Sequence, residues 1–332
     1  TNKLVSLPPN MKENNLLVSF IITYYNLPIE MLNECIDSIL QLSLHPSERE
    51  IIVVDDGSDN SPMNELMKYG DEIIYVRQKN GGLSTARNKG MDVATGKFIQ
   101  FVDADDQLIK TTYEQCLDIL RSQKDVDMVL FDFSTDLQVE SVSESVKPVC
   151  GSNYMLNNNI HGTAWGYIFR RAILGELRFT SGIYHEDEEF TPQLLLRAEE
   201  VYPTHVKAYY YNKRENSITS SKTSYDTEKR INDREGVIIR LHELCDKLPH
   251  QDRKALQRRV AQLTMDYIYQ IILDTHSEEE LQQRLKRLHT KGLFPLPDAH
   301  YSKKYVWFKR MTNHRLGRKV LLYTLPLLKK ER

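Results

Sequence analysis

The sequence is poor in cysteine, in long apolar runs and in glycine-rich phosphate motifs, and each shortage excludes a class of protein. Its four cysteines, Cys35, Cys116, Cys150 and Cys245, form no C-x-x-C pair, which argues against a zinc site and favours reduced thiols in a cytoplasmic protein. No apolar run approaches the roughly 18–20 residues of a membrane-spanning helix, and no signal peptide is visible. No G-x-G-x-x-G follows the first predicted strand and no G-x-x-x-x-G-K-[ST] occurs, so neither a dinucleotide fingerprint nor a P-loop is present.

The composition is that of a soluble globular protein. The 332 residues are 40% hydrophobic and 27% charged, enough for one large domain or two. The first ten residues are polar and contain proline, and Met11 is a plausible native start. We therefore expect residues 1–15 to be a leader or a disordered segment.

The first third of the chain alternates between apolar runs and helical periodicity. Strands are predicted at residues 16–22, 50–54, 72–77 and 97–102, with helical patterns between them. This alternation indicates a parallel sheet with right-handed crossovers. Ligands on such sheets bind beyond the carboxyl ends of the strands, so polar residues at those ends are candidates for a site.

Three carboxylates end the fourth predicted strand, in the run KFIQFVDADDQ at residues 97–107. Asp103, Asp105 and Asp106 repel one another unless a cation or a hydrogen-bond network holds them. Clustered hard oxygen ligands suit Mg²⁺ or Mn²⁺ and, through the cation, a substrate that carries phosphates. The alternative is a polar turn whose Asp caps the next helix, and this stretch alone leaves both interpretations open.

Other polar side chains fall at the same predicted edge of the sheet. The carboxylate of Asp56 can accept a hydrogen bond from an N–H of a uracil or guanine edge, whereas Asp55 fits a turn. Tyr25 can stack on a base or simply pack at the rim of the sheet. Arg87 can reach a phosphate or a base, or lie solvated on its helix.

The second half of the chain contributes a run of four acids and two further candidates. Glu186, Asp187, Glu188 and Glu189 precede an apolar helix and would favour its N-terminus through the helix dipole. Arg214 follows a tyrosine-rich strand and can hold a diphosphate or be a solvated strand end. Trp165 can stack on a sugar ring or belong to the core.

Three runs together resemble a known family. FIITYYN, EIIVVDDGSDN and NGGLSTARNKGMDVATGKFIQFVDADD are similar, in order and spacing, to the sugar-nucleotide-binding half of glycosyltransferase family 2. The resemblance covers about residues 16–215. It implies an α/β GT-A fold with a mostly parallel sheet, and an inverting transferase that uses a nucleoside diphosphate sugar, with UDP favoured, and Mn²⁺ or Mg²⁺. A glycan or lipid-linked sugar would be the acceptor, in cell-surface polysaccharide synthesis.

The resemblance also implies roles for the residues that match the family's motifs. Thr23, Tyr25 and Asp56 would sit at the nucleotide base, although the family often has Pro where Thr23 stands. Asp103 and Asp105 match the D-x-D pair. Asp105 would be a direct metal ligand and Asp103 would lie near ribose and metal.

On the acceptor side the match is to an E-D pair that supplies the catalytic base. Asp187 would be this base, with Glu186 as the alternate, while Glu188 and Glu189 would only start the helix. Arg214 lies where the family's Y-Y-Y-x-x-R-x-x-S-I-T segment passes the donor. The family often has Lys where Tyr167 stands.

The end of the chain has a different character. We expect a GT-A domain over residues 16–222 and a helical extension over residues 223–332 that ends in a basic amphipathic tail. Residues 301–332 contain ten Lys and Arg against one Glu, a net charge of +9, which leaves −11 for the rest. Basic charge with Trp, Phe and Leu suits an anchor on an anionic membrane surface, here the inner face of the cell membrane. The alternatives are a helix packed on the domain or a dimer contact, and no motif supports nucleic-acid binding.

Two other functions compete with glycosyl transfer. A strand followed by Asp103-x-Asp105 also resembles the nucleophile motif of haloacid dehalogenase-type phosphohydrolases, but Gln107 stands where that motif has Thr or Val. The third hypothesis is a scaffold that binds a sugar nucleotide without catalysis, against which the intact acidic residues argue.

Overall fold

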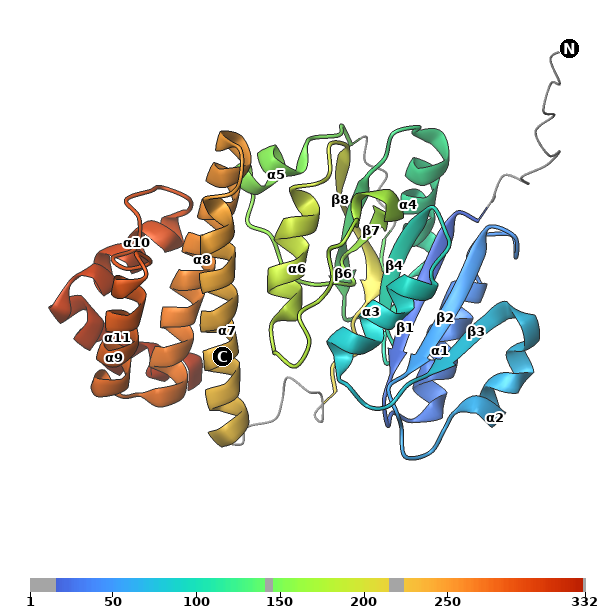
Figure 1. The fold of residues 1–332 in the computed structure, drawn as a ribbon, viewed down its shortest axis with the longest axis horizontal. Coiled ribbons are helices and arrows are strands. Elements are labelled where there is room, and N and C mark those ends of the chain that lie inside the picture. Colours follow the sequence, from blue (N-terminus) through green and yellow to red (C-terminus); the bar gives the residue numbers. More distant parts are fainter. Residues whose placement is uncertain (1–15, 141–145, 215–223, 331–332) are drawn as a thin grey trace, which may run out of the picture.

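The computed structural model describes residues 16–140, 146–214 and 224–330, and its centre is one eight-stranded sheet (Figure 1). The strands, in spatial order, are β3 (Ile73–Arg77), β2 (Arg49–Asp55), β1 (Val18–Tyr24), β4 (Phe98–Asp103), β7 (Tyr167–Arg170), β6 (Met128–Ser134), β8 (Val201–Tyr210) and β5 (Gln107–Leu108). The first four are parallel, as are β6 and β8, whereas β7 runs antiparallel to both of its neighbours and β5 to β8. The sheet is therefore mixed but mostly parallel, and the predicted α/β GT-A class is confirmed.

Helices cover both faces of this sheet. Those interleaved with the strands are α1 (Ile29–Leu40), α2 (Met63–Leu66), η1 (Met67–Glu72), α3 (Leu83–Val93), α4 (Lys110–Ser122), α5 (Gly151–Asn157), η2 (Arg171–Ile173) and α6 (Glu186–Leu195). The later ones are α7 (Ser224–Cys245), α8 (His250–Thr275), α9 (Glu278–Thr290), α10 (Lys303–Asn313) and α11 (Arg315–Lys330). Figure 1 shows α7 and α8 standing between the sheet and α9–α11.

The apolar strands explain the two hydrophobic cores. Phe20 and Ile22 of β1 join one core with α1 and α4, while Ile21 between them joins the other, with α3, α6 and the C-terminal helices. Both faces of the strand are thus buried, which is why its sequence is a continuous apolar run instead of an alternating one.

Glycines lie at the start of two of these helices. Gly151, the first residue of α5, packs so closely on α6 that an added Cβ would lie 1.8 Å from the Leu195 carbonyl oxygen. Gly82 is the N-cap of α3, with a φ of 88°. The helical extension is present from Ser224, but its predicted boundary at 222/223 falls outside the described residues, as does the predicted leader.

Candidate active site

The predicted site residues of the first half meet at one edge of the sheet. In the parallel register Thr23 pairs with both Val54 and Asp103, and Tyr24 pairs with Asp55. The carboxyl ends of β1, β2 and β4 therefore lie side by side. Tyr25, the next residue, is 48% exposed, so its ring is available at this edge for a ligand.

Asp56 holds the turn that leads into α3. Its buried carboxylate accepts hydrogen bonds from the Gln78 amide (2.7 Å) and from the backbone N–H groups of Gly81 (2.9 Å) and Gly82 (2.8 Å). A carboxylate has about four lone-pair sites, so one site is left for a ligand. Asp55 accepts from Tyr75, Arg77 and the Ser58 N–H, in agreement with the turn predicted for it.

Arg87 connects the two acidic motifs. Its buried guanidinium donates to Asp103 at 3.2 Å and to Glu186 at 2.8 Å, across 99 residues of sequence. The guanidinium lies 5.9 Å from the ring centroid of Phe101 and 5.4 Å from that of Phe179. These rings fix the cation from the sides while the carboxylates bind its donors. The end of β4 and the start of α6 are thereby held together.

The other carboxylates of the D-A-D-D run also have partners. Arg214 binds the Asp105 carboxylate, with its Nε 2.7 Å from an oxygen. Asp106 is buried and accepts from the Tyr209 hydroxyl and the Asn212 N–H, both at 2.8 Å. Burial, and then the charge of Asp103, raise the pKa of Asp106 to about 8. Asp106 therefore serves to fix this turn on β8.

Asp187 lies in the first turn of α6, next to Glu186. Its carboxylate accepts a hydrogen bond from the Glu188 N–H at 2.8 Å. Burial, followed by the charge of Glu186, raises the pKa of Asp187 to about 8, against a lowering effect of Arg87. Glu186 differs because Arg87 binds it directly. The raised pKa of Asp187 suits a base near neutral pH.

The helical extension anchors the same turn of α6, which the sequence did not predict. Arg240 of α7 binds both oxygens of Glu189 at 2.7 and 2.9 Å. Arg234 donates to Glu188 at 3.2 Å. The four-acid run therefore makes two kinds of contact: Glu186 binds Arg87, and Glu188 and Glu189 join α6 to the extension.

Aromatic rings line the far side of the carboxylate cluster. Trp165, half-buried, stacks on Tyr209 with centroids 4.4 Å apart and meets the edge of Phe133 at 5.5 Å. Tyr209 in turn donates to Asp106, so this stack belongs to the wall of the site. Trp165 is thus packed among three aromatic rings, those of Tyr209, Phe133 and Tyr211, while part of its surface stays exposed.

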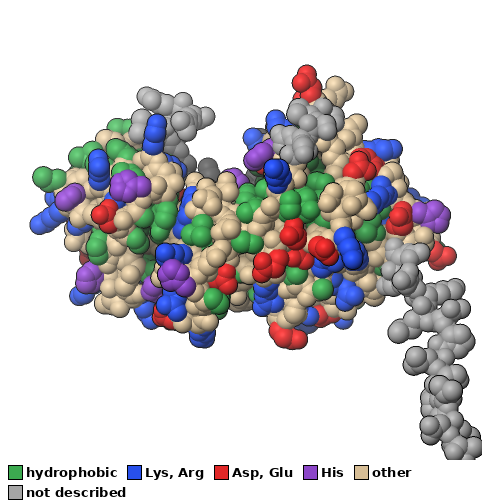
Figure 2. Space-filling model, turned by 90° about the horizontal axis from the view of Figure 1, so that it is seen from above, with side chains coloured by type: hydrophobic (Ala, Val, Ile, Leu, Met, Phe, Trp, Pro, Cys, Tyr) green, Lys and Arg blue, Asp and Glu red, His purple; other side chains and the backbone are tan. Residues whose placement is uncertain are grey.

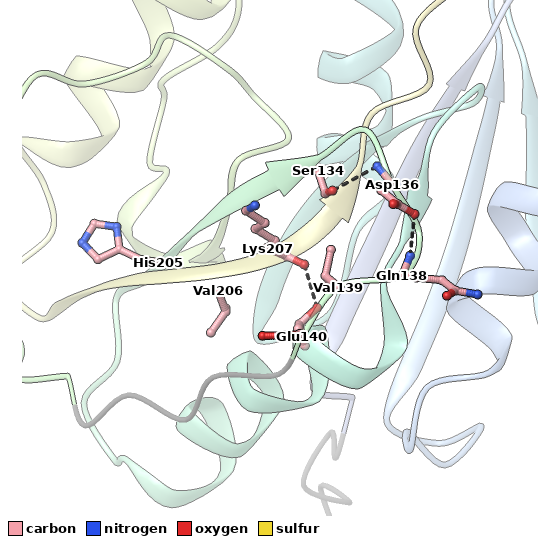
Figure 3. Close-up of a pocket in the computed structure, with 9 residues that line it drawn as sticks. Ser134, Asp136, Gln138, Val139, Glu140, His205, Val206 and Lys207 are labelled. Atoms are coloured by element: carbon pink, nitrogen blue, oxygen red, sulfur yellow. Dashed lines mark hydrogen bonds between the residues drawn. The ribbon is translucent and has the colours of Figure 1, made fainter.

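A separate hollow lies on the α4 side of β6 and β8 (Figure 3). Its volume is about 440 Å³, and Ser134, Asp136, Glu140, His205 and Lys207 are among its lining residues. None of the residues proposed for the active site lines it. We therefore place the chemistry at the carboxylate edge and not in this hollow.

The acidic residues fit a divalent cation that is shared with a substrate. Among the described residues, no group of three or more His, Cys, Asp or Glu side chains is placed to hold a metal by itself. Mg²⁺-type sites commonly use only one or two carboxylates, with water and substrate phosphates completing the shell. Asp103 and Asp105 would supply such a pair of oxygen ligands, and Arg214 is paired with Asp105 in the structure.

This fold and this site define a class of protein. The family model described as Glycosyl transferase family 2 matches residues 19–176, so this part of the chain is a domain of that family. The resemblance stated from the motifs is thereby confirmed, and the match favours glycosyl transfer over the haloacid dehalogenase alternative.

Curated bacterial glycosyltransferases are similar to parts of this chain. Glycosyltransferase GlyA of Streptococcus pneumoniae is 27% identical over 231 residues, which are 61% of this chain and 31% of GlyA. The chain spans 31%, 63% and 63% of the length of three curated bacterial relatives.

Two solved structures share the fold. S. aureus TarS 1–349 in complex with UDP-GlcNAc has a TM-score of 0.67 and 19% identity, over 95% of this chain and 92% of that one. Mannosyltransferase PcManGT from Pyrobaculum calidifontis, in complex with GDP-Man and Mn²⁺, has a TM-score of 0.55 and 15% identity, over 91% and 86%.

Proposed function

We propose that this protein transfers a sugar from a nucleoside diphosphate sugar to an acceptor hydroxyl, with inversion at the anomeric carbon. The observation that carries the proposal is the Arg87 junction, which joins the carboxylate pair at the end of β4 to the acidic start of α6. A donor held at the first and an acceptor held at the second would meet across this junction. Such positioning supplies much of the rate gain in bisubstrate reactions.

The donor would lie over the ends of β1, β2 and β4. Thr23, Tyr25 and Asp56 would contact the base, and UDP is the nucleotide we favour. TarS, with the same fold, binds UDP-GlcNAc. Asp103 and Asp105 would hold Mn²⁺ or Mg²⁺, which when bound offsets charge on the diphosphate leaving group. Arg214, released from Asp105, would donate to the diphosphate.

Asp187 would act as the general base. It removes the proton of the acceptor hydroxyl while the oxygen attacks the anomeric carbon on the face opposite the diphosphate. Glu186 remains paired with Arg87, so its part is to hold the junction. The acceptor would be a glycan or a lipid-linked sugar, and the reaction a step in cell-surface polysaccharide synthesis on the cytoplasmic side of the membrane.

Asp187→Asn tests this assignment. Removal of the base should lower transfer by roughly 10²–10⁴-fold while leaving the affinity for the donor within about twofold. Transfer is measured as sugar incorporated into the acceptor, and donor affinity by calorimetry. The exposed Asp92→Asn on α3 is the control and should behave as wild type. Normal transfer by Asp187→Asn would remove Asp187 from the role.

The rate of transfer should also depend on pH. Because the pKa of Asp187 is raised to about 8, most of the free protein holds this carboxyl protonated at pH 6.5. Only the ionised form can accept a proton, so kcat/KM should rise with pH up to about 8 and level off above it. A profile that is flat from pH 6 to 9 would contradict a base with this pKa.

A further inference from the structure

The exposed apolar side chains of the protein gather near its C-terminal end. Among the residues that the structure describes, eleven large hydrophobic side chains are exposed, and five of them lie within residues 307–327. These five are Trp307, Leu316, Val320, Tyr323 and Leu327. Single exposed apolar residues are ordinary, but a concentration of them marks an interaction surface.

Four of the five form one face of α11. Leu316, Val320, Tyr323 and Leu327 are spaced by four, three and four residues, which places them on one side of a helix. Their exposed fractions are 79%, 48%, 77% and 64%, whereas Leu321 and Leu325 on the opposite side are buried. The helix therefore has two apolar faces. One packs on the protein, and the other is left exposed by the residues that the structure describes.

The charge around this face is positive. No Asp or Glu occurs from residue 299 to residue 330, and Arg315 and Lys319 flank one side of the α11 stripe. Lys319 lies 3.6 Å from the carboxylate of Glu278 on α9, while Arg315 adds a second positive charge on that side. On α10, Lys303, Lys304 and Arg310 are exposed. Figure 2 shows basic, His and hydrophobic side chains at the end of the molecule formed by the C-terminal helices, with few acidic ones among them.

A hollow on α10 combines the same two chemistries. Its volume is about 440 Å³, and it is lined by His300, Ser302, Lys303, Val306, Trp307 and Arg310. Trp307 and Val306 offer an apolar surface, while Lys303 and Arg310 are donors for a phosphate oxygen. An anionic phospholipid headgroup, with its phosphate next to the start of its acyl chains, has the matching chemistry.

We propose that α10 and α11 bind the surface of an anionic phospholipid bilayer, with the α11 stripe in the interfacial layer. Basic residues beside an apolar helix face are the signature of an interfacial helix. The described residues contain no helix that is long and apolar enough to cross a membrane, so the mode is lying on the surface. A nucleic acid would use the charge but not the four-residue apolar stripe. The proposal is independent of the proposed glycosyl transfer.

Vesicle flotation of the full chain, without nucleotide, tests the proposal. Wild type should float with phosphatidylcholine vesicles that contain about 30% phosphatidylglycerol, which makes their surface anionic. It should stay unbound with vesicles of pure phosphatidylcholine. The triple variant Leu316→Ser, Tyr323→Ser, Leu327→Ser should bind at least roughly tenfold more weakly. The control variant Met63→Ser with Met67→Ser removes two exposed apolar side chains that lie outside α10 and α11, and it should float like wild type.

A charge variant keeps the test decisive if the triple variant does not fold. Arg315→Glu with Lys319→Glu should lower binding to anionic vesicles by more than about tenfold and weaken its salt dependence. Wild type that fails to float would overturn the proposal, as would a triple variant that is folded and floats normally. Light scattering of the same samples tests whether the exposed face instead binds a second copy of the chain. A dimer that wild type forms and the triple variant does not would assign the face to that contact. Donor binding, measured separately by calorimetry, reports on the active site and is unaffected by either outcome.

Discussion

At the scale of single residues, two arginines make the acidic site compatible with folding. Asp103, Asp105 and Asp106 lie within four positions of one another, and unpaired carboxylates at that spacing would repel. Arg87 binds Asp103, Arg214 binds Asp105, and Asp106 is held by Tyr209 with a raised pKa. The two arginines differ in surroundings, because Arg87 is buried between aromatic rings and Arg214 follows β8 near the surface. We therefore expect Arg87 to keep its ion pairs with Asp103 and Glu186 when a donor binds. Arg214 should instead leave Asp105 and bind the donor.

Arg214→Ala should separate the two tasks of this residue. Without the guanidinium, Asp105 is free for a cation, so affinity for Mn²⁺ alone should increase. Affinity for a UDP-sugar with Mn²⁺ should fall on the order of tenfold, because a charge-assisted contact to the diphosphate is lost. Calorimetric titrations with Mn²⁺, and then with UDP-sugar, measure both. Lys213→Ala at the exposed neighbouring position is the control. Weaker Mn²⁺ binding by Arg214→Ala would contradict the exchange.

Residue-level prediction from the sequence succeeded where a motif carries its own geometry. The acids at strand ends could be placed together because parallel strands end at one edge. The Arg87–Glu186 contact could not, since it spans 99 residues and depends on where α6 lies. The sequence predicts Glu188 and Glu189 only as helix-start residues, because their arginine partners come from α7, in a different part of the chain. These contacts had no local signal beyond an excess of acids.

At the scale of elements, the position of Arg87 depends on how α3 packs against β1. Gly90, one turn after Arg87, faces Ile21 so closely that an added Cβ would lie 2.3 Å from its Cγ2. The helix can approach the strand only because this position has no side chain.

Gly90→Ala tests this contact. In an open helix the change would stabilise by up to about 1 kcal/mol. Here the clash should instead cost about 1–3 kcal/mol and displace Arg87, so that transfer falls together with the free energy of unfolding. Urea denaturation measures the first effect and an activity assay the second. Lys89→Ala, exposed on the same turn, should be neutral. A Gly90→Ala protein as stable as Lys89→Ala would show that the contact relaxes without strain.

The elements most easily predicted were those with long periodic patterns. Strands β1–β4 and helices α7–α9 follow from apolar runs and helical spacing. The antiparallel direction of β7 could not be predicted, because a four-residue strand looks the same in either direction. Likewise β5 has two residues and α5 has seven, and both exist through contacts made by distant segments.

At the scale of the whole molecule, the order of the strands separates the proposed donor-binding part of the sheet from the rest. Strands β3, β2, β1 and β4 form one side, where the base and diphosphate would lie, and β7, β6, β8 and β5 form the other. The start of α6, where Asp187 follows Glu186, is joined to the end of β4 by Arg87. The helices α7 and α8 fix α6 from behind, and α10 with α11 present the proposed membrane surface. On this account the extension seats the catalytic base and also determines where the enzyme works.

The most direct test of the account is a thermal-shift screen of UDP-, GDP- and dTDP-sugars, each with and without Mn²⁺. A ligand at 100 times its Kd stabilises the native state by about 2.7 kcal/mol, which is a readily measured shift in Tm. The account predicts a shift with one nucleotide, UDP in our proposal, that requires Mn²⁺. It should be retained by Asp187→Asn and lost by Asp105→Ala. No shift with any nucleotide, from protein that melts cooperatively, would contradict a metal-dependent sugar-nucleotide site.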